Sequence, residues 1–279
     1  MKKIFVLYSL IILTIFGFIY GCSEVKDDVV MAPSTSFHGD GWVNPSSANF
    51  HGKSIAADNW NLALCKSCHG ADYSGGTAQV SCNTCHQSGP ESCNTCHGND
   101  DHIYPPKSLF GNTLNTQQGV GAHDKHMTTD TLNRISAVVE CEECHVPVSS
   151  FSDPNHISKD GKTAAGVIFG TIAKTVTEGV TPDPVWDKNA QTCSGTYCHG
   201  NFKNGNQTTV ANFLTPNSAS CGTCHGNPTT GNPLPGGTHP QNWAINKCYL
   251  CHGAVMNSAG QIIDKSKHIN GVVNFGLNN

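Results

Sequence analysis

The chain has 279 residues, a formal net charge of −4 at pH 7 and only 13% charged residues, and Arg134 is its single arginine. A nucleic-acid surface needs clustered arginines and lysines to neutralise phosphates, so this composition argues against nucleic acid as a partner. The 29 glycines and 14 prolines favour turns, which predicts a mostly irregular backbone with short α-helices and a few short β-strands.

Residues 1–21 are typical of a signal peptide, because two lysines precede a continuous apolar stretch from Ile4 to Tyr20. The sequence Ile19-Tyr-Gly-Cys22 resembles a bacterial lipobox, which implies cleavage before Cys22 and lipidation of that cysteine. Ser23 favours, by the same analogy, sorting to the outer membrane. The apolar stretch is near the lower length limit for a spanning helix, so a retained membrane anchor is the alternative.

Residues 22–36 are polar and without periodicity, which predicts a lipidated flexible tether. Loss of Lys2 and Lys3 with the signal peptide would change the formal charge from −4 to −6. A negative protein suits a cationic or metallic partner better than an anionic one. The sequence therefore predicts an exported protein held on a membrane by its lipid anchor.

Beyond the tether, seven cysteine pairs are each followed at once by a histidine, six with a two-residue gap and one with a four-residue gap. This is the attachment pattern of c-type haem: the thiols form thioethers with the haem vinyl groups, and the adjacent imidazole is the proximal iron ligand. In chain order, sites 1 to 7 are Cys65, Cys68 and His69; Cys82, Cys85 and His86; Cys93, Cys96 and His97; Cys141, Cys144 and His145; Cys193, Cys198 and His199; Cys221, Cys224 and His225; and Cys248, Cys251 and His252.

Zinc ribbons and disulfide frameworks also use paired cysteines, but neither requires a histidine directly after the second one. Since 15 of 279 residues are histidines, seven such coincidences have a chance on the order of one in a billion. The sequence thus predicts seven covalently bound haem c groups.

Sites 1 to 3 fall in residues 37–116 and sites 4 to 7 in residues 117–279, which we expect to be a three-haem and a four-haem module. Each haem has roughly 37 residues of chain, so the macrocycles should supply much of the core and the chain should wrap a closely packed haem chain. Sites 2 and 3 start eleven residues apart, at most about 38 Å of extended chain, which predicts neighbouring haems.

Short helices are expected where the chain enters three of the sites, and a hairpin is expected before the four-residue-gap site. The helices are predicted over residues 56–68, 138–144 and 243–251, and the hairpin over residues 164–177. An internal echo links His156, followed by Val167-Ile-Phe-Gly170, with His268, followed by Val273-Asn-Phe-Gly276. Each copy is expected to present a histidine on a loop before a short strand.

The chain resembles the multihaem lipoprotein cytochromes of metal-reducing bacteria that mix CxxxxCH with CxxCH haem-binding motifs. The resemblance covers residues 37–279 and is carried by Phe37-His-Gly39 with Trp42, Phe50-His-Gly52, Cys68-His-Gly70 with Gly75-Gly76, Gly121-Ala-His-Asp-Lys-His126, Cys144-His-Val-Pro147, Thr192-Cys-Ser-Gly-Thr-Tyr-Cys-His-Gly200 and His268-Ile-Asn-Gly271. It implies electron transfer at the periplasm or outer surface, in respiration on extracellular metal oxides. The implied partners are other redox proteins such as multihaem cytochromes, an outer-membrane conduit, and a metal or mineral acceptor.

Eight histidines lie outside the motifs, enough to close all seven irons with one to spare. A loop histidine is otherwise an ordinary solvated side chain, but most of these eight lie in the segments shared with the family. The expected distal ligands are His38, His51, His123, His126, His156, His239 and His268. His102 is the expected spare, because its Asp-Asp-His-Ile-Tyr-Pro-Pro turn is not one of the shared segments. Methionine is a poor competitor, and all-histidine ligation predicts low potentials.

The leading interpretation is an electron carrier, not an enzyme, in which electrons hop from haem to haem. One alternative is a multihaem reductase of a small oxyanion, which would need an iron with an exchangeable sixth position. The sequence has no Cys-x-x-Cys-Lys motif, a mark of the ammonia-forming nitrite reductases. Another alternative is a subunit of a haem filament, against which the lipid anchor argues.

Overall fold

The computed structural model describes residues 37–130, 132, 134–153, 156, 166–216, 220–240 and 242–276. The expected signal peptide and tether, with Cys22, lie outside the described residues. The described backbone divides into two compact units, residues 37–54 and residues 55–276. The expected three-haem and four-haem modules stay a prediction.

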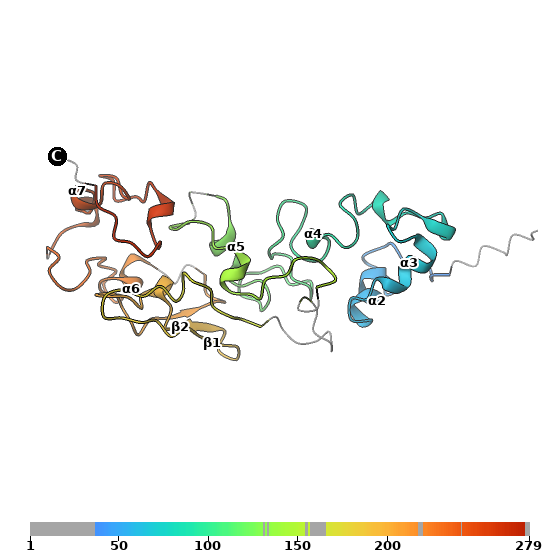
Figure 1. Cartoon of the computed structure of the whole chain (residues 1–279), viewed down its shortest axis with the longest axis horizontal. Coiled ribbons are helices and arrows are strands. Elements are labelled where there is room, and N and C mark those ends of the chain that lie inside the picture. The colour runs from blue at the N-terminus through green and yellow to red at the C-terminus, as the bar shows by residue number, and fades with distance from the viewer. Residues whose placement is uncertain are drawn as a thin grey trace, which may run out of the picture. The chain divides into compact units, whose positions relative to one another are not determined.

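The described backbone consists mostly of loops, with short helices and one small sheet (Figure 1). The α-helices are α2 (His51–Ala57), α3 (Ala63–His69), α4 (Cys93–Cys96), α5 (His123–Met127), α6 (Cys221–Cys224) and α7 (Tyr249–His252). The 3-10 helices are η1 (Gly76–Ala78), η2 (Cys82–Thr84), η3 (Cys141–Glu143), η4 (Tyr197–His199), η5 (Ile245–Lys247) and η6 (Lys265–Lys267). In the part of the chain that the structure describes, no helix is long and apolar enough to cross a membrane.

Each predicted helix is shorter in the structure than in the sequence interpretation. The helix expected over residues 56–68 is interrupted between the end of α2 at Ala57 and the start of α3 at Ala63, because Asn59 and Trp60 have left-handed backbones (φ 55° and 61°) that a right-handed helix cannot contain. The one expected over residues 138–144 is the single turn η3, and the one over residues 243–251 is split into η5 and α7.

The sheet has three antiparallel strands in the order β1 (Val185–Asp187), β2 (Thr192–Ser194) and β3 (Val210–Asn212). Cys193 is at the centre of the middle strand, opposite Trp186 on one side and Ala211 on the other. The hairpin predicted over residues 164–177 is wrong for the part that is described, since Val167 pairs with His145 and Thr177 pairs with Val180.

The described residues bury very few apolar side chains. The buried ones are Leu62, Tyr73, Val120, Ala122, Ala173 and Val255, whereas large apolar side chains such as Phe110 (81% exposed) and Phe275 (67% exposed) are open. A chain of this length loses far more conformational entropy on folding than the burial of so few side chains offsets. A folded state therefore needs an additional source of apolar surface.

Candidate haem-binding sites

Each two-residue-gap motif overlaps a short helix or a helical turn. In α4 and α6 the two cysteines are the first and last residues, and residues three apart on a helix lie on the same face. At five sites the histidine backbone N–H donates to the carbonyl of the first cysteine, which holds the histidine backbone one helical turn after that cysteine. These bonds join His86 to Cys82 (2.9 Å), His97 to Cys93 (2.9 Å), His145 to Cys141 (2.8 Å), His225 to Cys221 (3.3 Å) and His252 to Cys248 (2.8 Å).

At site 2 the second cysteine lies just outside the helical turn. The 3-10 helix η2 begins at Cys82 and ends at Thr84, so Cys85 follows it directly. The Cys85 N–H still donates to the Cys82 carbonyl (3.1 Å), and the Ser81 hydroxyl caps the turn by accepting from the Asn83 N–H (3.1 Å). Cys85 is an exposed free thiol. Its expected thioether to the haem of site 2 stays a prediction.

Site 5, with the four-residue gap, is built differently. Its first cysteine, Cys193, lies on strand β2, and its second, Cys198, lies in η4. Gly195 turns the chain between them with a left-handed backbone (φ 65°), and a Cβ atom there would clash with the carbonyl of Asp183. The wider gap therefore reflects a strand followed by a turn, where the other motifs have one helical turn.

Five pairs of histidine rings face each other across nearly the same distance. Each pair joins the proximal histidine of one site to one of the expected distal histidines. The ring-centroid separations are 6.0 Å for His97 and His156, 6.1 Å for His145 and His123, 6.1 Å for His199 and His126, 6.5 Å for His225 and His268, and 6.4 Å for His252 and His239.

This distance can be compared with the space that one metal ion needs between two imidazoles. A metal–nitrogen bond of about 2.0 Å plus an imidazole ring radius of about 1.1 Å puts each centroid about 3.1 Å from the metal, or about 6.2 Å across the pair. All five separations lie within about 0.3 Å of that value. The histidines therefore fit a six-coordinate iron at sites 3 to 7.

Backbone carbonyls orient these rings. Where Nδ1–H donates to a carbonyl, Nε2 keeps its lone pair and is the nitrogen that can bind a metal. The bonds from Nδ1 are His123 to Val120 (2.7 Å), His126 to Ala122 (2.9 Å), His145 to Gly166 (3.4 Å), His156 to Phe151 (3.0 Å), His225 to Pro233 (2.6 Å), His252 to Asn274 (2.9 Å) and His268 to Ile135 (2.7 Å).

Burial favours the neutral form of six of the paired imidazoles. Loss of solvent, the largest cause, lowers the pKa of His123 and of His199 to about 4. It also lowers the pKa values of His97, His126, His225 and His268. Neutral imidazole is the form that binds a metal, so these rings are in the ligand state at neutral pH.

Helix α5 presents two histidines to two different sites. His123 faces the proximal ligand of site 4, and His126, one turn later, faces that of site 5. The buried Val120 and Ala122 fix the start of this helix, and their carbonyls accept the two Nδ1–H bonds. Since residues three apart on a helix have Cβ atoms about 5–6 Å apart, sites 4 and 5 must be neighbours.

Two sets of hydrogen bonds connect site 4 to site 5 and site 5 to site 6. The buried Ala173 donates its N–H to the Glu143 carboxylate (2.7 Å) in the site 4 motif and accepts from the Tyr197 N–H (2.8 Å) in the site 5 motif. Asn206 then ties the segment after site 5 to α6: its N–H donates to the Cys224 carbonyl (2.9 Å), and its amide donates to two other α6 carbonyls.

Tyr73 joins the attachment segments of sites 1, 2 and 3. Its hydroxyl donates to Glu91 (2.6 Å), just before site 3, and Glu91 forms an ion pair with Lys66 (2.8 Å), inside the site 1 motif. Its carbonyl accepts from the Cys82 N–H (3.1 Å) of site 2. Burial and the neighbouring Glu91 raise the pKa of Tyr73, so the hydroxyl stays protonated and remains a donor.

The two remaining expected distal ligands are His38 and His51. In the first unit, the His38 ring stacks on Trp42 at 4.1 Å, and His51 Nδ1 bonds to the Trp42 carbonyl (2.9 Å). In the second unit, His69 Nδ1 bonds to the Val80 carbonyl (2.8 Å), the orientation seen at the paired sites. The role of His38 and His51 as distal ligands stays a prediction.

His102, the expected spare, is placed differently from the paired histidines. Its Nδ1 donates to the Tyr104 carbonyl (2.6 Å), its Nε2 lies 3.4 Å from the Asn99 amide nitrogen, and its ring stacks on Tyr104 at 4.1 Å. Both ring nitrogens thus have polar contacts, and the expectation that His102 is the spare histidine stays a prediction.

The two alternative uses of the paired cysteines are disulfide bonds and a zinc site. The fourteen cysteines of the seven motifs are all free thiols. Among the described residues, no group of three or more histidine, cysteine or acidic side chains is placed to hold a metal ion by itself.

Beside Cys221 of site 6 there is an open groove of about 550 Å³, lined in part by Pro233, Trp243 and Ile245.

In comparisons with family models, curated proteins and solved structures, nothing matches this chain.

Proposed function

We propose that this chain is a heptahaem c-type cytochrome that carries electrons, with a histidine on each side of every iron. The observation that supports it most strongly is the set of five proximal–distal histidine pairs, at 6.0 to 6.5 Å between ring centroids. Ordinary loop histidines have no reason to pair at one separation, each time with one partner from a CxxCH or CxxxxCH motif. One iron between each pair of rings accounts for this regularity.

Ligation from both sides favours a carrier over an enzyme. A reductase needs an iron position that a substrate can occupy, whereas two imidazoles fill both axial positions. Haem supplies one-electron exchange when it is bound. The chain contributes the ligands, keeps their Nε2 atoms free of protons and fixes the sites close to one another, as α5 does for sites 4 and 5.

The cellular setting of the proposal comes from the sequence. Lipidation at Cys22 would hold the protein on the outer membrane, where it would exchange electrons with other multihaem cytochromes or an outer-membrane conduit. The negative charge of the chain would suit a metal or mineral acceptor. Fractionation of the Cys22→Ser variant would separate a lipid anchor from a retained helix.

The proposal predicts a fully low-spin protein with two classes of ferric signal. The spread of g values in a low-spin ferric haem grows as the planes of its two imidazoles approach a right angle. The planes are close to parallel in the pairs of sites 3, 4 and 7 (33°, 17° and 15°) and close to perpendicular in those of sites 5 and 6 (77° and 82°).

Electron paramagnetic resonance of the oxidised protein should therefore show at least two highly anisotropic low-spin signals beside several rhombic ones. The reduced protein should not respond to carbon monoxide. A stoichiometric high-spin signal in the unmutated protein would contradict the closed ligation and would favour a reductase.

A further inference from the structure

One C-terminal segment contacts two haem sites at once. Its His268 faces His225 of site 6 at 6.5 Å, and its Asn274 carbonyl accepts the Nδ1–H bond of His252, the proximal histidine of site 7 (2.9 Å). Gly276 fixes the end of the segment, since its N–H donates to the Cys251 carbonyl (3.0 Å) and its carbonyl accepts from the Gly253 N–H (2.9 Å). We call residues 264–276 the strap.

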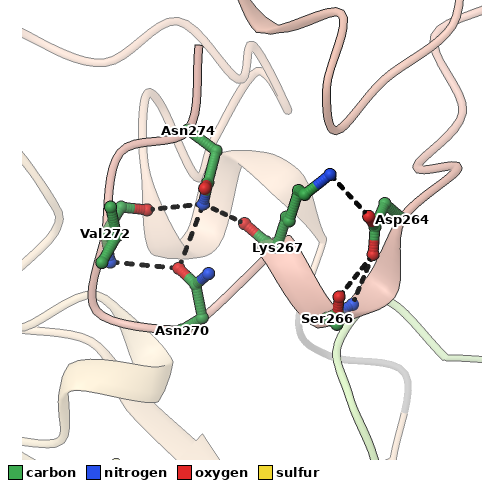
Figure 2. Close-up of polar contacts among 6 residues, drawn as sticks. All are labelled: Asp264, Ser266, Lys267, Asn270, Val272 and Asn274. Atoms are coloured by element: carbon green, nitrogen blue, oxygen red, sulfur yellow. Dashed lines mark hydrogen bonds and ion pairs between the residues drawn. The ribbon is translucent and has the colours of Figure 1, made fainter. Parts of the chain in front are cut away.

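Two polar clusters hold the strap in shape, one around Asp264 and one around Asn274 (Figure 2). Before His268, the Asp264 carboxylate accepts from the Ser266 N–H (3.1 Å) and hydroxyl (2.6 Å) and pairs with Lys267 (2.9 Å). This cluster caps η6, and His268 follows directly. The histidine is thus presented from a fixed turn.

After His268, the side chain of Asn274 closes the strap on itself (Figure 2). Its Nδ2 donates toward the Lys267 carbonyl (2.9 Å), the Val272 carbonyl (3.1 Å) and the Asn270 Oδ1 (3.2 Å). Asn270 Oδ1 also accepts from the Val272 N–H (3.0 Å). One amide therefore connects the turn that carries His268 to the residue whose carbonyl orients His252.

From these contacts we propose that Asn274 is a positioning residue that couples sites 6 and 7, an inference that rests on the proposed function. Through the Lys267 carbonyl it fixes the turn that presents His268 toward site 6. Through its own backbone carbonyl it holds the Nδ1–H of His252. An acceptor on Nδ1–H makes an imidazole a stronger donor to iron and so favours the oxidised form.

Around sites 3 and 4, the segment that echoes the strap in sequence makes related contacts, each two residues earlier than the sequence echo would place it. His156 faces His97 of site 3 at 6.0 Å, and the Gly166 carbonyl accepts from Nδ1 of His145 in site 4 (3.4 Å). The Ile168 N–H donates to the Cys144 carbonyl (3.0 Å), as Gly276 does to Cys251. In both places one segment supplies a ligand to one site and a carbonyl to the proximal histidine of the next.

The test compares Asn274→Ala with Asn257→Ala in the haem-loaded, full-length protein. Asn257 is a matched control, because its side chain also makes three hydrogen bonds in an exposed turn and that turn carries no histidine. Its amide donates to Gln261 Oε1, and its Oδ1 accepts from the N–H groups of Ala259 and Gln261. The readouts are haem count by mass, carbon monoxide binding by the reduced protein, paramagnetic resonance and the seven midpoint potentials.

With Asn274→Ala we expect seven haems but two altered centres. One centre, site 6, should gain carbon monoxide binding or a high-spin fraction as His268 loosens. A second, site 7, should stay low-spin but shift to a higher midpoint potential, because without the Asn274 side-chain bonds the backbone carbonyl of residue 274 is held less firmly against His252. Asn257→Ala should leave all seven centres unchanged.

A His268→Ala reference identifies site 6, because it opens that centre directly. The double variant His268→Ala/Asn274→Ala should still shift the midpoint potential of one further centre, that of site 7. If Asn274→Ala does not accumulate, Asn274→Ser keeps one donor and should show the same two changes at smaller size. The inference is overturned if Asn274→Ala alters only one centre or none. It is also overturned if Asn257→Ala alters the same two centres to the same extent. An unmutated protein without seven low-spin haems would instead overturn the proposed function.

Discussion

Alanine at His123 or at His126 is expected to open a different iron in each case, although the two residues are one helical turn apart. His123→Ala removes the ring facing His145 and so exposes the iron of site 4, whereas His126→Ala exposes that of site 5. Each variant should convert one of seven centres from low-spin to high-spin and allow one carbon monoxide to bind per chain. The double variant should open two.

Carbon monoxide titration of the reduced variants, followed by optical spectroscopy, measures this effect directly. His102→Ala is the control, because both nitrogens of that ring have polar contacts with Asn99 and Tyr104, so the variant should bind no carbon monoxide. Binding in His102→Ala, or the loss of the same centre in both α5 variants, would contradict the assignment of ligands.

A chain produced without haem attachment is expected to remain unfolded. The described residues bury only six apolar side chains. Of these, only Val120 is a large side chain that is fully buried. Since ordering each residue costs about 1–2 kcal/mol in backbone entropy, burial on this scale cannot fold the chain without the macrocycles. Residues 22–279, made in the cytoplasm where no haem is attached, should lack a cooperative thermal transition.

Amide hydrogen exchange compares this haem-free chain with the loaded protein. Exchange should be fast throughout the haem-free chain and slow around α5 and the sheet in the loaded protein. A cooperative unfolding transition or protected amides in the haem-free chain would show that the polypeptide has a core of its own.

The sequence predicts the seven attachment sites and the set of candidate ligands, because thioether attachment requires fixed chemistry at fixed spacing. It also predicts the predominance of loops, since glycine and proline are frequent. The hairpin over residues 164–177 failed because the alternating pattern cannot reveal that Val167 pairs with a distant chain segment at His145. The helix over residues 56–68 is confirmed only in part, because the sequence pattern did not reveal the left-handed backbone at Asn59 and Trp60 that interrupts it.

The pairing of histidines could not be predicted from the order of the chain. His123 and His126 both precede the motifs that they face, whereas His156 and His268 follow theirs. Which ring meets which depends on how the loops fold back. Carbonyl acceptors, such as that of Asn274, are backbone groups that any residue provides, so no sequence signal identifies them.

The most direct test of the account is the intact mass of the mature protein from a host that attaches haem. All fourteen motif cysteines are free to form thioethers, including Cys85 after η2 and the four-residue-gap pair of Cys193 on β2 and Cys198 in η4. The mature protein should show a mass increase of seven haems that persists under denaturing conditions. An increase of six would remove one site from the set, with site 5 the first to check, and a mass with no haem would contradict the account as a whole.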